Sequence, residues 1–355
     1  MRSVLPFLRR RWRLVLLSLC LLASCRTVSF YTQAARGQWQ IASRARPIKE
    51  VLGSHGTSTV LRSRLEVVQE LRAFARTELR LPADEQYDRY CDLGRKFVVW
   101  VVYAAPEFSV EGKKWWYPLV GSLKYRGYFN EQEAEEEAAR LRKAGFDVFV
   151  GGVQAYSTLG WFRDPVLNTF LSRSDAELAE LLFHELTHQR LFISGDTDFN
   201  EAFATAVGEE GARRWLRAEG RSRELEIYEG NLKVERDFIR LVLETRSRLG
   251  VIYLKEKSKD ELRRLKQAEF VRLRTEAEEL KKKHGAGLPV DRWFSKPVNN
   301  ARLNTLATYY DLVPVFEKLL AKESGDLERL FQRVSTLKSL SVDARRAALI
   351  SAAGS

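Results

Sequence analysis

The stretch AELLFHELTHQRLFISGDTDFNEAFA, residues 179–204, decides how this chain folds around its chemistry. It contains two of the chain's four histidines, His184 and His188, and Glu185 directly follows the first of them. Glu201, the second residue of an Asn-Glu pair, follows thirteen residues beyond His188. These side chains belong either to a metal site with its own general base or to an ordinary charged helix.

The residues around the histidines predict two helices joined by a short loop. Ser174 and Glu177 fit a capping box, so the first helix should begin at Ser174. Leucines at helical spacing then give it an apolar face. The letters GDTD end the loop, and a second helix should begin at Asp198 or Asn200 and run to about Leu216.

Residues four apart on a helix project from the same face, so His184 and His188 can bind one Zn²⁺. Glu185 lies one position further round the helix, where it can reach a metal-bound water and act as a general base. A catalytic zinc needs three protein ligands and one open position, so a third ligand must come from elsewhere. Glu201, in the first turn of the second helix, is the best candidate.

Other assignments of this cluster remain open. Asp198 or Glu209 could replace Glu201 as the third ligand. A histidine six residues after His188 would indicate a metzincin, but that position is Ser194. The alternative to any metal site is that the two histidines are ordinary helix residues paired with acids, and that Glu201 is an acid favoured by the helix dipole.

The first 24 residues predict a lipoprotein signal peptide. The basic letters MRSVLPFLRRRWR precede the apolar run LVLLSLCLLAS, which is short for a membrane-spanning helix. The run leads into LASC (22–25), the pattern in which a cysteine, here Cys25, is lipidated and becomes the mature N-terminus. An uncleaved anchor helix is the alternative. Both interpretations place the body outside the cytoplasm, and Arg26 in place of an aspartate favours the periplasmic side of the outer membrane.

Charge and cysteine content narrow the class of protein. The net charge is +12, but five arginines fall within the first 13 residues, so the body is only mildly basic. No nucleic-acid-binding motif is present, and we expect no nucleic acid partner. Cys20 leaves with the signal and Cys25 carries the lipid. The remaining Cys91 cannot form an internal disulfide and should be a buried apolar residue.

The remaining sequence predicts an α+β fold with a small mixed sheet and a long helical C-terminal region. The predicted elements are helices at 61–80 and 130–145, β-rich stretches at 96–105, 115–129 and 146–153, a helical hairpin between 220 and 284, and further helices at 301–323 and 324–335. Within 119–153, a strand–helix–strand unit could contain two parallel strands.

The predicted domain organisation follows from these elements. We expect a signal peptide at 1–24, a tether at 25–60, a zincin-like catalytic domain at 61–220, and a helical region at 221–355 that packs on it.

The chain resembles a family of predicted bacterial zinc aminopeptidases of the gluzincin type. The similar stretches are ARPIKEVL, WVVYAAPEFS, KYRGYF, AYSTLGWFRDPVLNTF, HELTHQ, FNEAFATAVGEEG and NNARLNTLATYYDLVPVFEKLL, which cover most of residues 46–320. The resemblance implies that His184, His188 and Glu201 bind zinc, that Glu185 is the catalytic acid/base, and that the substrate is a peptide.

The chain departs from this family at several positions. Members often have cysteines where this chain has Trp116 and Ser122, so the disulfide that the resemblance implies is absent here. Members also often have asparagine at the position of Val101. These differences do not involve the implied metal ligands.

Further residues could serve such a site. A hydrolase of this type needs a donor for the developing oxyanion, and Tyr156 and Tyr310 are candidates. An exopeptidase also needs an acid for the substrate's α-amine. The aminopeptidase signature Gly-x-Met-Glu-Asn is absent, and Glu107 and Glu209 are candidates for that acid. A purely structural role is the alternative for each of the four.

Together, these features predict a membrane-anchored periplasmic zinc metallopeptidase, with an aminopeptidase favoured. Its partners would be a peptide substrate and the membrane, which it would contact through the lipid anchor. The alternatives are a non-catalytic envelope lipoprotein scaffold that retains a zinc site, and a zinc endopeptidase or amidase. Glu185 argues against the scaffold, because a site without turnover needs no general base.

Overall fold

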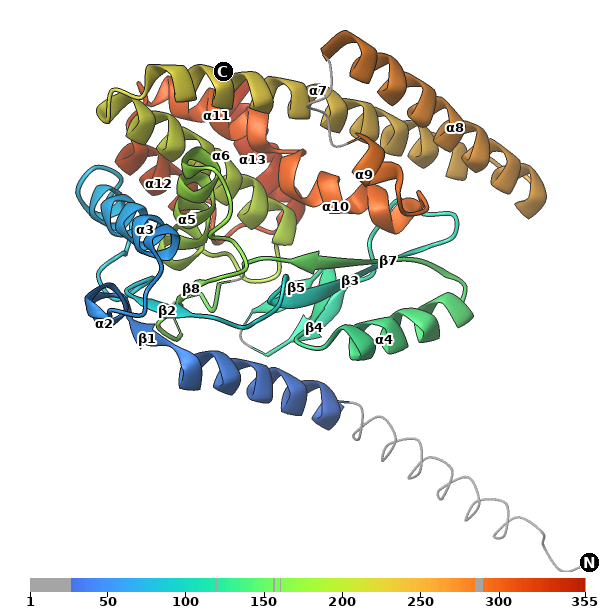
Figure 1. The fold of residues 1–355 in the computed structure, drawn as a ribbon. Coiled ribbons are helices and arrows are strands. Elements are labelled where there is room, and N and C mark those ends of the chain that lie inside the picture. The colour runs from blue at the N-terminus through green and yellow to red at the C-terminus, as the bar shows by residue number, and fades with distance from the viewer. Residues whose placement is uncertain (1–26, 119, 156, 160, 285–289, 355) are drawn as a thin grey trace, which may run out of the picture.

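The computed structural model describes residues 27–118, 120–155, 157–159, 161–284 and 290–354. The predicted signal peptide, Cys25 and Tyr156 lie outside the described residues. Figure 1 shows small sheets with a layer of helices above them, and with α4 and the N-terminal helix at 27–44 on the opposite side. The expected α+β class is confirmed.

The described strands form three small sheets. Their bounds are β1 (Arg46–Pro47), β2 (Arg89–Cys91) and β8 (Val166–Leu167) in the first sheet; β6 (Tyr125–Tyr128), β3 (Val99–Pro106) and β7 (Phe146–Val153) in the second; and β4 (Trp115–Tyr117) and β5 (Gly121–Leu123) in a hairpin. The first sheet is mixed, because β2 pairs antiparallel with β1 and parallel with β8. In the second sheet, β3 is central and antiparallel to both neighbours.

The predicted strand–helix–strand unit is β6, α4 (Glu131–Lys143) and β7. Since β6 and β7 are each antiparallel to β3, they run in the same direction, but β3 lies between them and they do not pair. As predicted, Asn130 caps α4 by accepting a hydrogen bond from the backbone N–H of Glu133. Gly145 follows the helix with φ +83°, a conformation that glycine adopts easily.

The two faces of β3 have different environments because successive side chains alternate across a strand. Val102 and Ala104 pack with the apolar face of α4. Val99, Val101 and Tyr103 point to the other side, where they join the main core and line a cavity. The second sheet therefore separates α4 from the layer that carries the predicted metal ligands.

The helical layer contains most of the described helices. Its elements are α3 (Thr59–Thr77), α5 (Asp175–Arg190), α6 (Thr197–Ala218), α7 (Ser222–Tyr253), α8 (Lys259–His284), α9 (Val290–Phe294), α10 (Asn300–Tyr310), α11 (Val313–Lys322), α12 (Leu327–Ser335) and α13 (Val342–Gly354). The predicted hairpin is formed by α7 and α8, which share an apolar cluster. The single helix expected at 301–323 is instead α10 and α11, and Pro314 lies in the first turn of α11, where its missing N–H costs nothing.

The N-terminal part of the body differs from the predicted tether. Residues 27–44 are helical, and β1 and α2 (Ile48–Gly53) follow. Ile41, Ile48 and Val51 are buried in the main core, so these segments belong to the packed body. The pattern was not apparent in the sequence because Gln33 and Gly37 provide part of the buried face of the first helix.

The C-terminus also differs from expectation. The helix predicted at 324–335 is α12, but α13 follows it and its Leu349 joins the main core. That core extends from Ile41 to Ala353, so it draws on both sides of the boundary expected near residue 220. The domain limits themselves stay predictions. Cys91 is buried, as expected. Across the described ranges, no helix combines the length and the apolarity that crossing a membrane requires.

Candidate metal centre

Helix α5 begins where the sequence predicted. The side chain of Ser174 accepts a hydrogen bond from the backbone N–H of Glu177, and the Glu177 carboxylate accepts one from the backbone N–H of Ser174. This capping box satisfies donors that would otherwise lack partners at the helix start. It therefore fixes the residue at which α5 begins.

One face of α5 lines the cavity that lies between the helical layer and the second sheet. Five residues of the helix lie on this face, at the spacing of one helical stripe: Glu180, Leu181, His184, Glu185 and His188. The pattern i, i+1, i+4, i+5, i+8 follows from the 3.6-residue repeat. Both histidines and the adjacent glutamate therefore face the same enclosed space.

The loop after α5 is held by the start of α6. The side chain of Asn200 donates a hydrogen bond to the carbonyl oxygen of Ile193 (2.7 Å) and accepts one from its backbone N–H (2.9 Å). Asp196 caps α6, so the helix begins two to four residues earlier than expected. Asp196 also forms a buried ion pair with Arg345 of α13. These contacts fix the start of α6, and Glu201 follows as its fifth residue.

A glycine sets the separation of α5 and α6. A Cβ atom at Gly208 would lie 2.7 Å from the carbonyl oxygen of Glu180 and 3.2 Å from the Cβ of His184. Any larger residue would force the two backbones apart. Glu201 lies two turns before Gly208 on the same helix, so this close approach brings its carboxylate to the histidines.

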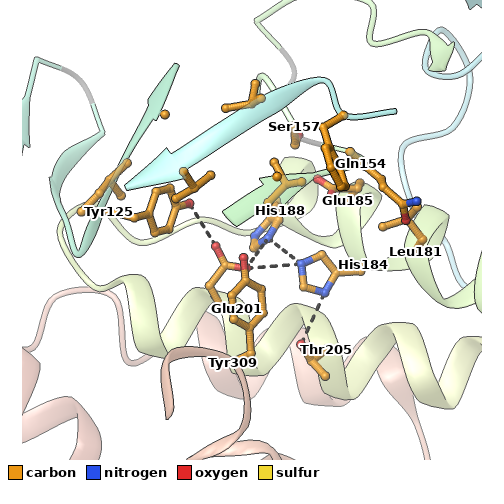
Figure 2. Close-up of a pocket in the computed structure, with 18 of the residues that line it drawn as sticks. Tyr125, Gln154, Ser157, Leu181, His184, Glu185, His188, Glu201, Thr205 and Tyr309 are labelled. Carbon is orange, nitrogen blue, oxygen red and sulfur yellow. Dashed lines mark hydrogen bonds and ion pairs between the residues drawn. The ribbon is translucent and has the colours of Figure 1, made fainter. Parts of the chain in front are cut away.

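Three side-chain atoms converge at the centre of the site (Figure 2). The Nε2 atoms of His184 and His188 are 3.1 Å apart, and Oε2 of Glu201 lies 3.4 Å from each of them. Tetrahedral zinc with bonds of about 2.0–2.1 Å would separate its ligand atoms by about 3.3 Å. The donor set and its spacing therefore fit a zinc ion, and among the described residues this is the group identified as able to hold a metal.

The alternative third ligands lie elsewhere. Asp198 pairs with Lys124 at 2.5 Å. Glu209 is 1% exposed and pairs with Arg213 and Arg236. Glu201 is therefore the acid that the structure brings to the histidines.

Burial and the mutual contacts of the ligands shift their pKa values. Burial alone would raise the pKa of Glu201, but the two imidazoles outweigh it and hold that pKa well below its usual range. Burial lowers the pKa of His184 despite its contact with Glu201. For His188, burial acts in the same sense, but the charge and hydrogen bond of Glu201 and the charge of Glu185 together outweigh it, and the pKa is raised. The carboxylate is thus kept ionised, the form in which it can bind a metal.

Other side chains orient the ligands. The hydroxyl of Tyr125 donates a hydrogen bond to Oε1 of Glu201 at 3.2 Å, which leaves Oε2 facing the histidines. Oγ1 of Thr205 lies 3.5 Å from Nδ1 of His184, and the ring of Tyr309 stacks on that histidine. Metal-binding residues commonly have such outer contacts, which fix the ring and carboxylate orientations.

Glu185 is 7% exposed and faces the cavity beside the ligands. Burial raises its pKa to about 8, and the charges of Glu201 and Asp164 add to this against the opposing effect of His188. No ion pair holds Glu185 among the described residues. Its carboxyl group is therefore available to exchange a proton with a molecule bound in the cavity.

Tyr309, which was not among the predicted oxyanion donors, and the predicted Tyr310 both line the cavity. The pKa of Tyr310 is raised by burial and then by the charges of Glu235 and Glu180. The pKa of the neighbouring Tyr309 is raised by burial and then by the charge of Glu201. Consecutive helical residues point about 100° apart, and the letters ATYYDL could not show which one faces the metal site. Tyr156 lies outside the described residues.

The cavity has a volume of about 610 Å³. The wall opposite α5 is largely apolar and comes from the second sheet, with Val99, Val101, Gly127, Gly152 and Val153. The predicted amine-binding acids do not line it. Glu209 is turned toward its arginines, and Glu107 pairs with Arg263 of α8.

The positions that distinguish this chain from the family lie outside the ligand set. Trp116 and Ser122 are directly opposite each other in the β4–β5 hairpin, where two cysteines would be cross-strand neighbours. Val101 lies in the cavity wall on β3. The first difference affects the hairpin, and the second affects the surface that a substrate would meet.

Comparison with known proteins places the whole body in one family. A family described as "Putative aminopeptidase" matches residues 29–349. No match was found among curated proteins or among solved structures. The matched region includes the metal centre, the cavity and the helices on both sides of them. The chain therefore belongs to this aminopeptidase family, whose name assigns it to the peptidases.

Proposed function

We propose that this protein is a zinc-dependent aminopeptidase of the gluzincin type, with a zincin-like arrangement of its ligand helices. The observation that carries the proposal is the convergence of His184, His188 and Glu201 within 3.1–3.4 Å, with Glu185 beside them in the same cavity. Two imidazoles and one carboxylate are a known ligand set of catalytic zinc. When bound, zinc would polarise the scissile carbonyl and make a nearby water more acidic.

Glu185 supplies the proton transfers. Its carboxylate takes a proton from the attacking water and later delivers it to the leaving amine nitrogen. The carboxyl group suits this role because it is buried, faces the cavity and has no fixed cationic partner among the described residues. A surface glutamate held in an ion pair would be neither buried nor free of a cationic partner.

Tyr309 is the proposed donor to the developing oxyanion. Its ring stacks on His184, and its hydroxyl is hydrogen-bonded with that of Tyr103. Tyr125 is less suitable because its hydroxyl orients the ligand carboxylate of Glu201, whereas the hydroxyl of Tyr309 contacts another tyrosine, Tyr103. A donor placed in a water-excluded site stabilises charge that develops only as the reaction proceeds.

We also propose that Cys25 carries a lipid that anchors the enzyme at the periplasmic face of the envelope, with the outer membrane favoured. The proposal rests on the sequence LASC after a basic and then apolar segment. Labelled fatty acid fed to expressing cells should enter the wild-type protein and should not enter Cys25→Ala. Equal labelling of the two proteins would contradict the anchor.

Zinc content and peptide hydrolysis test the enzymatic proposal together. Purified protein should hold about one zinc per chain and cleave peptides that have free N-termini. Glu185→Gln should keep the zinc and lose roughly 10²–10⁴-fold in kcat, the usual contribution of a general base. A wild type without stoichiometric zinc would overturn the proposal.

Two further outcomes separate the rival functions. If the protein holds zinc but wild type and Glu185→Gln are equally inactive across a peptide library, the scaffold interpretation gains. If peptides with blocked N-termini are cleaved as well as free ones, the enzyme is an endopeptidase or amidase.

A further inference from the structure

We infer that Glu180 binds the N-terminal ammonium group of the substrate. The inference rests on the proposed function, because it gives that function its requirement for a free amine. Glu180 belongs to the face of α5 that lines the cavity, four residues before His184. It is neither a metal ligand nor the proposed base.

The position of Glu180 matches the geometry of an aminopeptidase substrate. The ammonium nitrogen of such a substrate lies two bonds from the carbonyl carbon that is attacked. One helical turn advances about 5.4 Å, so the Glu180 side chain starts one turn from the His184 side chain on the same stripe. A carboxylate there can reach the amine of a residue whose carbonyl lies at the metal ligands.

Glu180 lacks the ion-pair partner that other enclosed or partly enclosed acids of this protein have. Asp198 pairs with Lys124, and Glu209 pairs with two arginines. Within the described residues, Glu180 forms no ion pair. Its recorded side-chain partner there is the hydroxyl of Tyr228, which donates to Oε2 at 2.7 Å. This contact orients the carboxyl group but does not neutralise its charge.

The surroundings favour a cationic ligand at this position. Burial raises the pKa of Glu180 to about 8, and the charges of Glu209 and Glu235 contribute, while Tyr228 and Arg173 oppose. A buried carboxylate without a cation is costly, and a bound ammonium would supply the missing charge. The facing sheet wall is apolar at Val99, Val101 and Val153, so it offers the ammonium no competing anion.

The other acids of the cavity have different roles. Glu201 is committed to the histidines and Glu185 is the proposed base. Glu107 pairs with Arg263 and does not line the cavity, so it is a suitable matched control. Among the described acids that line the cavity, Glu180 is the one left for substrate recognition.

Glu180→Gln tests the inference with little change in shape, because the amide oxygen can still accept the Tyr228 hydrogen bond. For a leucyl peptide with a free amine, kcat/KM should fall about 10- to 100-fold, mainly through KM, as expected for the loss of a charged hydrogen bond. Zinc content should not change. The N-acetylated peptide should be cleaved poorly and equally by both proteins, and Glu107→Gln should behave as wild type.

Binding provides a readout that needs no turnover. Calorimetry with 3-methylbutylammonium, which has no carbonyl group, should show binding to wild type and Glu107→Gln, and about 10- to 100-fold weaker binding to Glu180→Gln. Glu180→Asp keeps the charge and should bind more tightly than Glu180→Gln. If Glu180→Gln does not fold, the comparison of Glu180→Asp with wild type provides the test in its place.

The two proposals fail in different ways. If wild type cleaves free-amine peptides but Glu180→Gln matches it in KM and in ammonium binding, the role of Glu180 is wrong and the aminopeptidase stands. If wild type holds no zinc and cleaves nothing while ammonium binding still depends on Glu180, the peptidase is wrong and the amine site stands.

Discussion

Helix α6 carries two buried glutamates, and the protein balances their charges in different ways. Glu201 faces His184 and His188, whose nitrogens converge with its own oxygen. Two turns later, Glu209 is surrounded by the guanidinium groups of Arg213 and Arg236. The first arrangement leaves lone pairs directed at one point, which suits a metal ion. In the second, fixed cations of the fold already balance the charge through Oε2 of Glu209.

Glu180 of α5 represents a third arrangement. Among the described residues it forms no ion pair with a histidine or an arginine, although the charge of Arg173 acts on it, and Tyr228 is its hydrogen-bond partner there. The comparison shows that buried acids of one sequence have different chemistry according to whether the balancing cation is part of the fold. Substitutions of these acids should therefore separate metal binding from stability.

The largest expected effect is on metal binding by Glu201→Gln. An amide oxygen carries no charge and is a poor zinc ligand, so zinc affinity should fall by more than about 100-fold, beyond what outer contacts contribute. Competition with a chelator of known affinity measures the change. Glu209→Gln is the matched control on the same helix and should retain full zinc. Equal affinity in Glu201→Gln and wild type would exclude Glu201 as a ligand.

The reverse pattern is expected for stability. Glu209→Gln leaves Arg213 and Arg236 without a buried partner, which should cost about 3 kcal/mol, the lower end for a broken buried pair. The lower end applies because Arg236 also contacts Glu317. Urea denaturation of the metal-free proteins measures the change in free energy of unfolding. A stability equal to that of wild type would show that the pairs contribute nothing.

The parts of the site that follow from local sequence were predictable. The capping box at Ser174 and the spacing of His184, Glu185 and His188 need only a regular helix. Glu201 was predictable because a helix must restart soon after the short loop. The two hydrogen bonds between the Asn200 side chain and the backbone of Ile193 support this geometry, although the sequence does not reveal them.

The parts that depend on packing between distant segments were not predictable. Tyr309 faces the ligands because α10 packs against α6 and β3, and one residue of rotation would present Tyr310 instead. In the sequence, Glu180 is one of several acids of a helix. Only the position of the cavity shows that it lies on the enclosed face. The buried face of the first helix includes Gln33 and Gly37, so the hydrophobic pattern there was too weak to distinguish a packed helix from a tether.

A smaller effect should follow from changing the distance between the two ligand helices. The added Cβ in Gly208→Ala would meet backbone at 2.7 Å and should destabilise the protein by about 1–3 kcal/mol, while zinc affinity falls as Glu201 moves away. Gly230→Ala is a matched control in α7, because nothing lies within 4 Å of its added Cβ. It should stabilise by up to about 1 kcal/mol through helix propensity. Similar effects of the two substitutions would show that the close approach does not matter.

The smallest effect concerns Asp175, an acid at the start of α5 that pairs with Arg64 and Arg221. Burial opposes ionisation, but the arginines outweigh it and lower the pKa of Asp175 below 3.8. The folded state therefore binds fewer protons than the unfolded state, and the stabilisation is complete above the unfolded pKa and lost as pH falls through the folded pKa. Asp175→Asn should cost about 1 kcal/mol at pH 7, since Asp175 and its two arginine partners are all partly exposed.

That deficit should narrow as the pH falls below 4, because wild type then loses the same interaction. Thermal unfolding of the two proteins at pH 7, 5 and 3 measures the difference, and any titration at the metal centre is common to both and cancels. Asp84→Asn is the control, since Asp84 is largely exposed and its contact with Arg76 is long, at 3.5 Å. A deficit that stays constant down to pH 3 would mean that Asp175 stabilises α5 through hydrogen bonds that survive protonation, and that charge pairing with arginines is not what distinguishes it from Glu180.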